Sequence, residues 1–318
     1  MKITSLFVPV LVAASVSAHG FVYKFTVNGK EFIGNVPSAK PAPSVIREVT
    51  EQDPVKGASN PSLTCGQNST AGSLIANVNP GDTVTFDWRT ASLGPWPHNT
   101  GPMLTYMANC GATTCDKFDI SQAKWFKVQQ VGRKNDTTWF QADLMTGGVA
   151  TTTIPNTLAA GNYLIRHEII ALHLATALGG AEFYPSCTQL QVGGNQTGAP
   201  QASELVSLPG AYSDNDPGIF DPDVFNPGSN YTFPGPAIAS FVSGSGDGTI
   251  TNGTGSTTGS TPTTASPPAA TSAASSKSSK TCKIKKRSTS EDNTLLVRPR
   301  HVSRIMRRLA FSHSLSRR

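Results

Sequence analysis

Histidine, cysteine and charge are all scarce in this chain of 318 residues. It has six histidines and five cysteines, and only 14% of its residues are Asp, Glu, Lys or Arg. After residue 18, no apolar run reaches the length of about 20 residues that a membrane-spanning helix needs. We therefore expect a soluble product without a transmembrane segment.

Basic charge is also scarce once the C-terminal tail is set aside, although the whole chain has a net charge of +6. Residues 281–318 contain 11 Lys and Arg residues but only two acids, Glu291 and Asp292. Without this tail and Lys2, 14 basic and 18 acidic residues remain. A mildly acidic body has no electrostatic footprint for nucleic acid, so we expect no such partner.

The first 18 residues have the pattern of a secretory signal peptide. Lys2 gives the positive start, Leu6 to Ala14 the apolar run, and Val16-Ser17-Ala18 a small-residue cleavage site. We therefore expect a secreted, extracellular protein whose first residue is His19. An N-terminal histidine offers one metal two nitrogens, its α-amine and its ring Nδ1.

Export favours disulfides among the five cysteines, Cys65, Cys110, Cys115, Cys187 and Cys282. Cys110 and Cys115 are near enough in sequence to close a local loop, which would leave Cys65 and Cys187 for a long one. The sequence alone does not fix this pairing. N-glycosylation sequons mark surface loops at Asn68, Asn135, Asn195, Asn230 and Asn252.

Short segments rich in β-formers alternate with turn signals along the chain. The strands we expect cover residues 21–27, 83–88, 125–131, 149–154, 162–172 and 188–192. Asn28-Gly29 is a strong hairpin signal, and residues 34–75 have the composition of a long loop. No convincing long amphipathic helix is present, so the pattern predicts an all-β protein, either an antiparallel β-sandwich or a β-barrel.

The composition changes at Ser243. Residues 243–280 are dominated by Gly, Ser, Thr, Pro and Ala, which is typical of a flexible linker. Residues 281–318 form the basic tail, which we expect to be a disordered extension without a folded domain. The folded domain then spans residues 19–242.

The four histidines of the body are the candidates for a metal site, because such a site needs imidazoles brought together by the fold. His19 follows the cleavage site, His98 lies in a Gly- and Pro-rich loop, and His173 ends a predicted strand. We interpret His167, in the middle of that strand, as a half-buried structural histidine.

Several stretches together resemble one known family. They are His19-Gly20-Phe21, the His98-Asn99-Thr100-Gly101-Pro102 loop running on to Tyr106-Met107-Ala108, the segment from Arg166 to His173, Phe183-Tyr184-Pro185-Ser186-Cys187, and Asp216-Pro217-Gly218-Ile219. Over about residues 19–235 the chain resembles the fungal lytic polysaccharide monooxygenases of auxiliary-activity family 9.

The resemblance implies an immunoglobulin- or fibronectin-like antiparallel β-sandwich whose long loops form a flat active face. His19, through its amine and Nδ1, and His98 would bind one copper ion, with Tyr184 in an axial position. His173 would donate a hydrogen bond to bound oxygen. The family's usual disulfides correspond to Cys65–Cys187 and Cys110–Cys115.

The activity that the resemblance implies is oxidative cleavage of β-1,4-glucan, such as cellulose, at C1 and/or C4. The co-substrate would be O2 or H2O2, and an external electron donor would supply reductant. A nitrogen-rich site suits Cu(II), which also heads the divalent affinity order. We expect a monomer that acts on a polysaccharide surface, with Tyr212, Phe225 and Tyr231 as candidates for stacking on sugar rings.

Two positions depart from the family pattern. The loop from His98 to Pro102 is one residue longer than the common form, and Glu182 stands where the family usually has Gln. An ionised carboxylate cannot donate a hydrogen bond. We therefore treat Glu182 as a catalytic residue that transfers protons or tunes the copper.

Two other functions fit parts of the sequence. A glycoside hydrolase needs two carboxylates flanking the scissile bond, for which Glu168 and Glu182 could be nominated. Glu168 alternates with Arg166, however, and is more simply explained as half of a structural ion pair. The other alternative is a non-catalytic protein that binds copper or polysaccharide.

Overall fold

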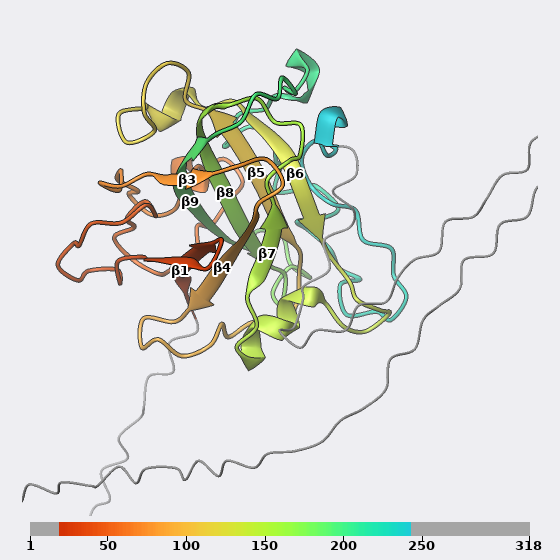
Figure 1. The fold of residues 1–318 in the computed structure, drawn as a ribbon. Helices are drawn as coiled ribbons and strands as arrows, with labels where there is room; N and C mark the ends of the chain where they lie inside the picture. Colours follow the sequence, from red (N-terminus) through yellow and green to blue (C-terminus); the bar gives the residue numbers. More distant parts are fainter. Residues whose placement is uncertain (1–18, 243–318) are drawn as a thin grey trace, which may run out of the picture. The chain divides into compact units, whose positions relative to one another are not determined.

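The computed structural model describes residues 19–242, which form two β-sheets packed against each other (Figure 1). The signal segment, the linker and the basic tail with Cys282 lie outside the described residues. The smaller sheet has the order β2-β1-β4-β7, and the larger one β3-β9-β8-β5-β6. The strands are β1 Phe21–Val27, β2 Lys30–Ile33, β3 Ala76–Val78, β4 Thr83–Arg89, β5 Met103–Asn109, β6 Trp125–Val131, β7 Ala150–Thr153, β8 Gly161–Ala171 and β9 Glu182–Val192.

The predicted β-sandwich is confirmed, and the two sheets do not close into a barrel. Neighbouring strands pair antiparallel, except that β3 runs parallel to β9. The predicted hairpin joins β1 to β2, with Asn28 at φ 51° and Gly29 at φ 75°. Positive φ at both positions is what a two-residue hairpin turn requires, and Asn and Gly adopt it at low cost.

The layer between the sheets is the main hydrophobic core. Phe25 and Phe86 from the smaller sheet meet Ile165 and Ile169 from β8, and all four are fully buried. His167 lies in the same layer, stacked on Phe86 at 4.5 Å between ring centroids. It is therefore more deeply buried than the half-buried position that we expected.

His167 is held in this core as a neutral ring. Its Nδ1 accepts a hydrogen bond of 3.1 Å from Trp88 Nε1. Burial, aided by the nearby Arg166 guanidinium, lowers the pKa of His167 to about 3. The structural role predicted for this histidine agrees with both observations.

A second hydrophobic cluster covers the outer face of the larger sheet. Leu104, Trp125, Leu164 and Phe183 are buried there under loops and short 3-10 helices. The 3-10 helices of the described residues are η1 Pro61–Leu63, η2 Ile120–Gln122, η3 Phe140–Thr146, η4 Ala202–Glu204 and η5 Ser240–Val242, of which η3 and η5 contribute Leu144 and Val242 to the main core instead. Strands β5, β8 and the first half of β9 are consequently buried on both faces.

Burial on both faces explains where the strand predictions were incomplete. A strand covered on both sides loses the alternation of apolar and polar residues that marks a half-exposed strand. We did not predict β5, every residue of which is buried except Asn109. The short β3 was also missed, because its three residues are too few to show a pattern. We predicted only residues 188–192 of β9, which begins at Glu182.

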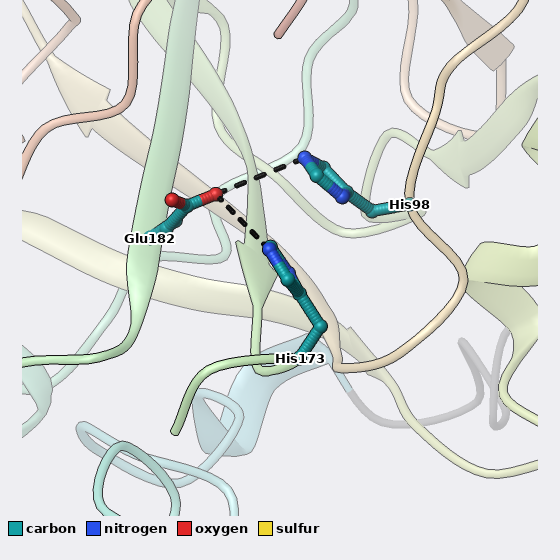
Figure 2. A group of neighbouring side chains, drawn as sticks. All are labelled: His98, His173 and Glu182. Carbon is teal, nitrogen blue, oxygen red and sulfur yellow. Dashed lines mark ion pairs between the residues drawn. The ribbon is translucent and has the colours of Figure 1, made fainter. Parts of the chain in front are cut away.

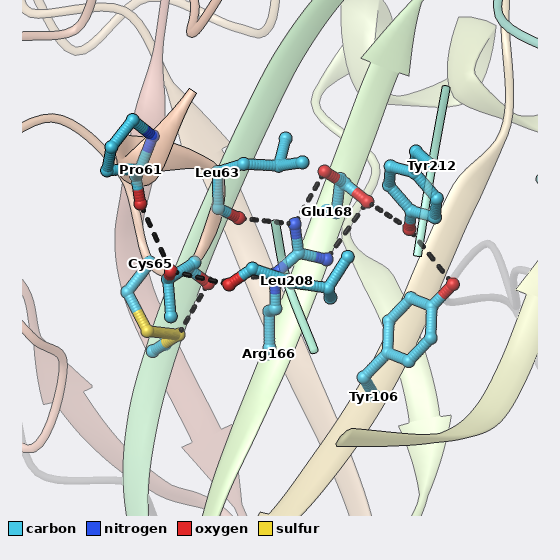
Figure 3. A network of polar contacts seen from close by, with 10 residues as sticks. Pro61, Leu63, Cys65, Tyr106, Arg166, Glu168, Leu208 and Tyr212 are labelled. Atoms are coloured by element: carbon cyan, nitrogen blue, oxygen red, sulfur yellow. Dashed lines mark hydrogen bonds and ion pairs between the residues drawn. A yellow bond between two sulfur atoms is a disulfide. The ribbon is translucent and has the colours of Figure 1, made fainter. Parts of the chain in front are cut away.

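A buried polar network ties the outer loops to the larger sheet (Figure 3). Arg166 donates two hydrogen bonds to Glu168, at 2.6 and 2.9 Å, and reaches the backbone carbonyls of Leu63 and Thr64. Arg166 and Glu168 have no exposed surface, and Tyr212 donates a further hydrogen bond to Glu168. The structural ion pair predicted from their alternation is confirmed.

Both expected disulfides are present, Cys65–Cys187 and Cys110–Cys115. The first joins the loop after η1 to the middle of β9, beside the polar network (Figure 3). Within residues 19–242, no helix has the length and apolar character needed to cross a membrane.

Candidate metal centre

Polar side chains gather where the loops after β4 and β8 meet the start of β9 (Figure 2). His98 comes from the first of these loops and His173 from the second. Glu182 opens β9, where it pairs with Ala171 at the end of β8. Three separate segments of the chain therefore deliver their side chains to one end of the larger sheet.

The two imidazoles and the carboxylate form a group that could hold a metal ion. Glu182 Oε2 lies 3.7 Å from His98 Nε2 and 3.8 Å from His173 Nε2. The two histidine rings stack at 4.3 Å between centroids. One donor atom from each of the three residues lies within 4.8 Å of the others.

Tyr184 joins this group from β9, two residues after Glu182. Its hydroxyl donates a hydrogen bond of 2.9 Å to Glu182 Oε2 and lies 3.4 Å from His98 Nε2. Trp96 packs edge-on against both Tyr184 and His98, which fixes the two rings. Burial and the adjacent Glu182 carboxylate raise the pKa of Tyr184, so the phenol keeps its proton.

His19 enters the site from the start of β1. Its ring centroid lies 6.3 Å from that of Tyr184, and its Nδ1 is 2.8 Å from Asp53 Oδ1. The backbone can approach so closely because the next residue is Gly20, where a Cβ would stand 2.6 Å from the Arg89 carbonyl oxygen. Any metal bound through His19 Nδ1 must displace Asp53 from that nitrogen.

Glu182 is charged despite being only 6% exposed. Burial opposes its ionisation, but hydrogen bonds from Lys56 and Tyr184 and the charge of Lys56 outweigh burial, so the pKa of the carboxyl lies below its ordinary value. Lys56 Nζ is 3.1 Å from Glu182 Oε1. The carboxylate thus uses one oxygen for Lys56 and the other for Tyr184.

The donor set fits a metal that prefers nitrogen. His19 and His98 both lie near Tyr184, with ring centroids 6.3 and 6.0 Å from its own. His173 presents its Nε2 to Glu182 at 3.8 Å, so three imidazoles reach this end of the larger sheet. Imidazole nitrogen is a ligand that copper and zinc accept.

The three aromatic residues proposed to stack on substrate have different positions. Tyr212 is only 7% exposed, and its hydroxyl bonds to Glu168 and lies 2.9 Å from the Tyr106 hydroxyl. Its ring is therefore unavailable for stacking, and that prediction is wrong for this structure. Tyr231 is half-buried against Trp139 and donates to the Gly218 carbonyl, so it packs the loop.

Phe225 is the one member of the three whose ring is well exposed, at 59%. It borders a cleft together with Asn99 and Thr100, the two residues that follow His98. Leu174 and Leu178, from the loop that begins at His173, are also exposed, at 50% and 60%. The surface around the histidines therefore carries apolar groups that we did not predict.

The hydrolase alternative does not agree with the structure. Glu168 has no exposed surface and is committed to Arg166 and Tyr212. A carboxylate in that position cannot flank a glycosidic bond. Glu182 thus lacks the partner that this mechanism was proposed to use.

Three residues of the site were missed in the sequence: Asp53, Lys56 and Trp96. Asp53 and Lys56 lie in the long loop 34–75, whose composition gives no local signal of a site. Asp53 contacts His19, more than 30 positions away in the chain, and Lys56 contacts Glu182, more than 120 positions away. Trp96 stands two residues before His98 in the same Gly- and Pro-rich loop. This proximity was the only sequence feature that could have identified it as part of the site.

Comparison with known proteins agrees with this geometry. The model of Auxiliary Activity family 9 (formerly GH61) matches residues 19–231. The chain is 50% identical over 315 residues to AA9 family lytic polysaccharide monooxygenase D of Gloeophyllum trabeum, an alignment that covers 92% of this chain and 91% of that protein. It is 39% identical over 248 residues to monooxygenase B of Heterobasidion irregulare, covering 73% of this chain and 98% of that protein.

Solved structures give the same result. The crystal structure of HiLPMO9B is similar with a TM-score of 0.63 and 39% identity, covering 69% of this chain and 99% of that one. The extended catalytic domain of H. jecorina LPMO9A has a TM-score of 0.66 and 31% identity, covering 75% and 96%. With this sandwich and this histidine cluster, the chain belongs to auxiliary activity family 9, the lytic polysaccharide monooxygenases.

Proposed function

We propose that the chain, cleaved after Ala18 and secreted, is a copper-dependent monooxygenase that cleaves β-1,4-glucan chains such as cellulose. One copper ion per chain would be held by the His19 α-amine, His19 Nδ1 and His98, with Tyr184 as a further ligand. Bound copper would supply one-electron chemistry, with O2 or H2O2 as oxidant and an external reductant, for oxidation at C1 and/or C4.

The observation that carries this proposal is that His19 and His98 both lie near Tyr184, with ring centroids 6.3 and 6.0 Å from that of the tyrosine. Imidazole nitrogens with few oxygen donors are a set that suits copper. Two disulfides and four exposed sequon asparagines are consistent with export: Asn68, Asn135, Asn195 and Asn230.

The residues around the metal position have separate tasks. Tyr184 remains a protonated phenol because it is buried beside the Glu182 carboxylate. His173 is part-exposed and stacked on His98, a position from which its ring nitrogen could hold or donate a proton at the site. Glu182 is held between Lys56 and Tyr184, and we propose that it moves protons to and from the site or tunes the copper.

The substrate would lie across the loops that surround the histidines. Phe225, Leu174 and Leu178 provide exposed apolar area there, and such area suits the flat faces of sugar rings. A monomer is sufficient for this arrangement, because one chain supplies every proposed ligand. A non-catalytic copper- or polysaccharide-binding protein is the alternative, and it would share the metal site without turnover.

Mass spectrometry of the products from swollen cellulose tests the proposal. Copper-loaded protein beginning at His19 is incubated with and without ascorbate, and the His98→Ala variant serves as the matched control. We expect aldonic acids or 4-keto sugars only with ascorbate and only from the parent. Unoxidised oligosaccharides that are independent of ascorbate would show hydrolysis, and copper binding without any product would support the non-catalytic alternative.

A further inference from the structure

We propose that Lys56 is a positioning residue that keeps the Glu182 carboxylate out of the metal's ligand set. This inference rests on the proposed function, because it concerns the same metal position. It adds a role for a residue from a distant loop, and it explains how a carboxylate can stand beside two metal-facing imidazoles without becoming a third ligand.

Lys56 is fixed where it can do this. Its Nζ lies 3.1 Å from Glu182 Oε1 and donates to the Gly180 carbonyl at 3.2 Å. The loop that carries it is pinned on both sides of Lys56. Val55 and Phe183 exchange two backbone hydrogen bonds, and the Ala58 amide donates to Asp214 at 2.7 Å.

Glu182 is poised to bind a metal if it is released. Its Oε2 already lies 3.7 and 3.8 Å from the Nε2 atoms of His98 and His173. Two histidines and one carboxylate form a recognised ligand set for divalent metals. In the present arrangement, Lys56 occupies Oε1 and Tyr184 occupies Oε2, so neither oxygen is free.

The buried charge of Glu182 also supports this role for Lys56. A buried carboxylate costs free energy unless it is paired and hydrogen-bonded. Within the described residues, Lys56 is the one Lys or Arg that forms an ion pair with Glu182. If Lys56 is removed, the strongest remaining source of positive charge is the bound metal, so the carboxylate should turn toward it. A neutral glutamine at position 182 has no such tendency and does not need Lys56.

The test uses Lys56→Met, Glu182→Gln and the double variant in the protein beginning at His19. Lys56→Arg keeps the cation. The control is Lys24→Met, which removes a lysine from an ion pair with Glu31 in the β1–β2 hairpin. The readouts are the Cu(II) electron paramagnetic resonance spectrum and the affinity for Zn(II), which accepts His and Glu ligands.

We expect Lys56→Met to change the copper hyperfine splitting and to tighten Zn(II) binding about tenfold or more, equivalent to about 1.4 kcal/mol. The double variant should match Glu182→Gln in both readouts, whereas Lys56→Arg and Lys24→Met should match the parent.

The inference is overturned if Lys56→Met has the parent spectrum and the parent Zn(II) affinity, or if Lys56→Met and the double variant change equally relative to the parent. A parent protein that binds no copper would contradict the proposed function instead, and the Zn(II) titrations would still decide the role of Lys56.

Discussion

Two polar clusters of the larger sheet differ in how completely their hydrogen-bonding groups are satisfied. The Arg166–Glu168 network has no exposed surface, its ion pair is bidentate, and its contacts are 2.6–2.9 Å long. The candidate metal centre at the end of β8 and β9 has longer histidine–carboxylate distances of 3.7 and 3.8 Å. We infer that the first cluster holds the fold and that the second is built to receive a ligand.

The same substitution in the two clusters should separate these roles most strongly. Glu168→Gln leaves Arg166 as an unpaired buried charge, and we expect a loss of about 3–5 kcal/mol in the free energy of unfolding. Glu182→Gln frees a lysine that is 46% exposed, so water can solvate it and the loss should stay within about 1 kcal/mol. Urea unfolding of both variants measures the difference, and equal losses would contradict the comparison.

Removing a proposed metal ligand should weaken copper binding strongly but leave the stability of the metal-free protein almost unchanged. His98→Ala is expected to weaken copper binding by at least about a hundredfold, equivalent to about 2.7 kcal/mol. The metal-free protein should unfold at nearly the parent urea concentration, because His98 is not part of the core. Calorimetric titration with copper tests the first expectation, and unchanged affinity would remove His98 from the ligand set.

The buried His167 should make the stability of the fold depend on pH. The folded-state pKa of His167 is about 3, below its ordinary value of 6.5. As the pH falls through this window, the unfolded chain binds the proton first, so stability is lost on acidification. From pH 6.5 to 5 this histidine should cost the parent about 1.5 kcal/mol.

The variant His167→Gln isolates this effect, because an amide oxygen can still accept the hydrogen bond from Trp88. Urea unfolding at the two pH values should show the parent losing more stability than the variant. Parallel pH dependence in the two proteins would mean that His167 does not titrate as its burial requires.

The smallest effect concerns the substrate surface. Phe225→Ala should weaken binding to cellulose about five- to tenfold, because an exposed ring that stacks on sugar contributes about 1 kcal/mol. Tyr231→Phe removes a hydroxyl that donates to the Gly218 carbonyl and should leave cellulose binding unchanged. Pull-down isotherms with both variants measure this, and a larger loss for Tyr231→Phe would place the binding surface elsewhere.

The sequence predicted those parts of the fold whose signals are local. Strands β1 and β4 were found because their residues are rich in β-formers, and the Asn28-Gly29 turn was found because both residues accept positive φ. Strand β5 was missed because its neighbours bury it on both faces. Aromatic residues near the active face could not be sorted, because the exposure of Phe225 and the burial of Tyr212 depend on tertiary packing.

The candidate site likewise contains some residues that the sequence could predict and others that it could not. His98, His173, Glu182 and Tyr184 lie in motifs that a resemblance can identify, and the structure brings these four together. Asp53 and Lys56 lie in a long loop without any motif, yet they contact His19 and Glu182. Such partners are defined by the folded chain and not by local spacing.

The central claim is that cleavage after Ala18 makes His19 a two-nitrogen copper ligand. Calorimetric copper titration of protein beginning at His19, and of protein with one alanine added before it, tests this claim directly. We predict one copper per chain, with affinity at least about a hundredfold lower in the extended protein, equivalent to about 2.7 kcal/mol. Equal affinities in the two proteins would contradict the claim.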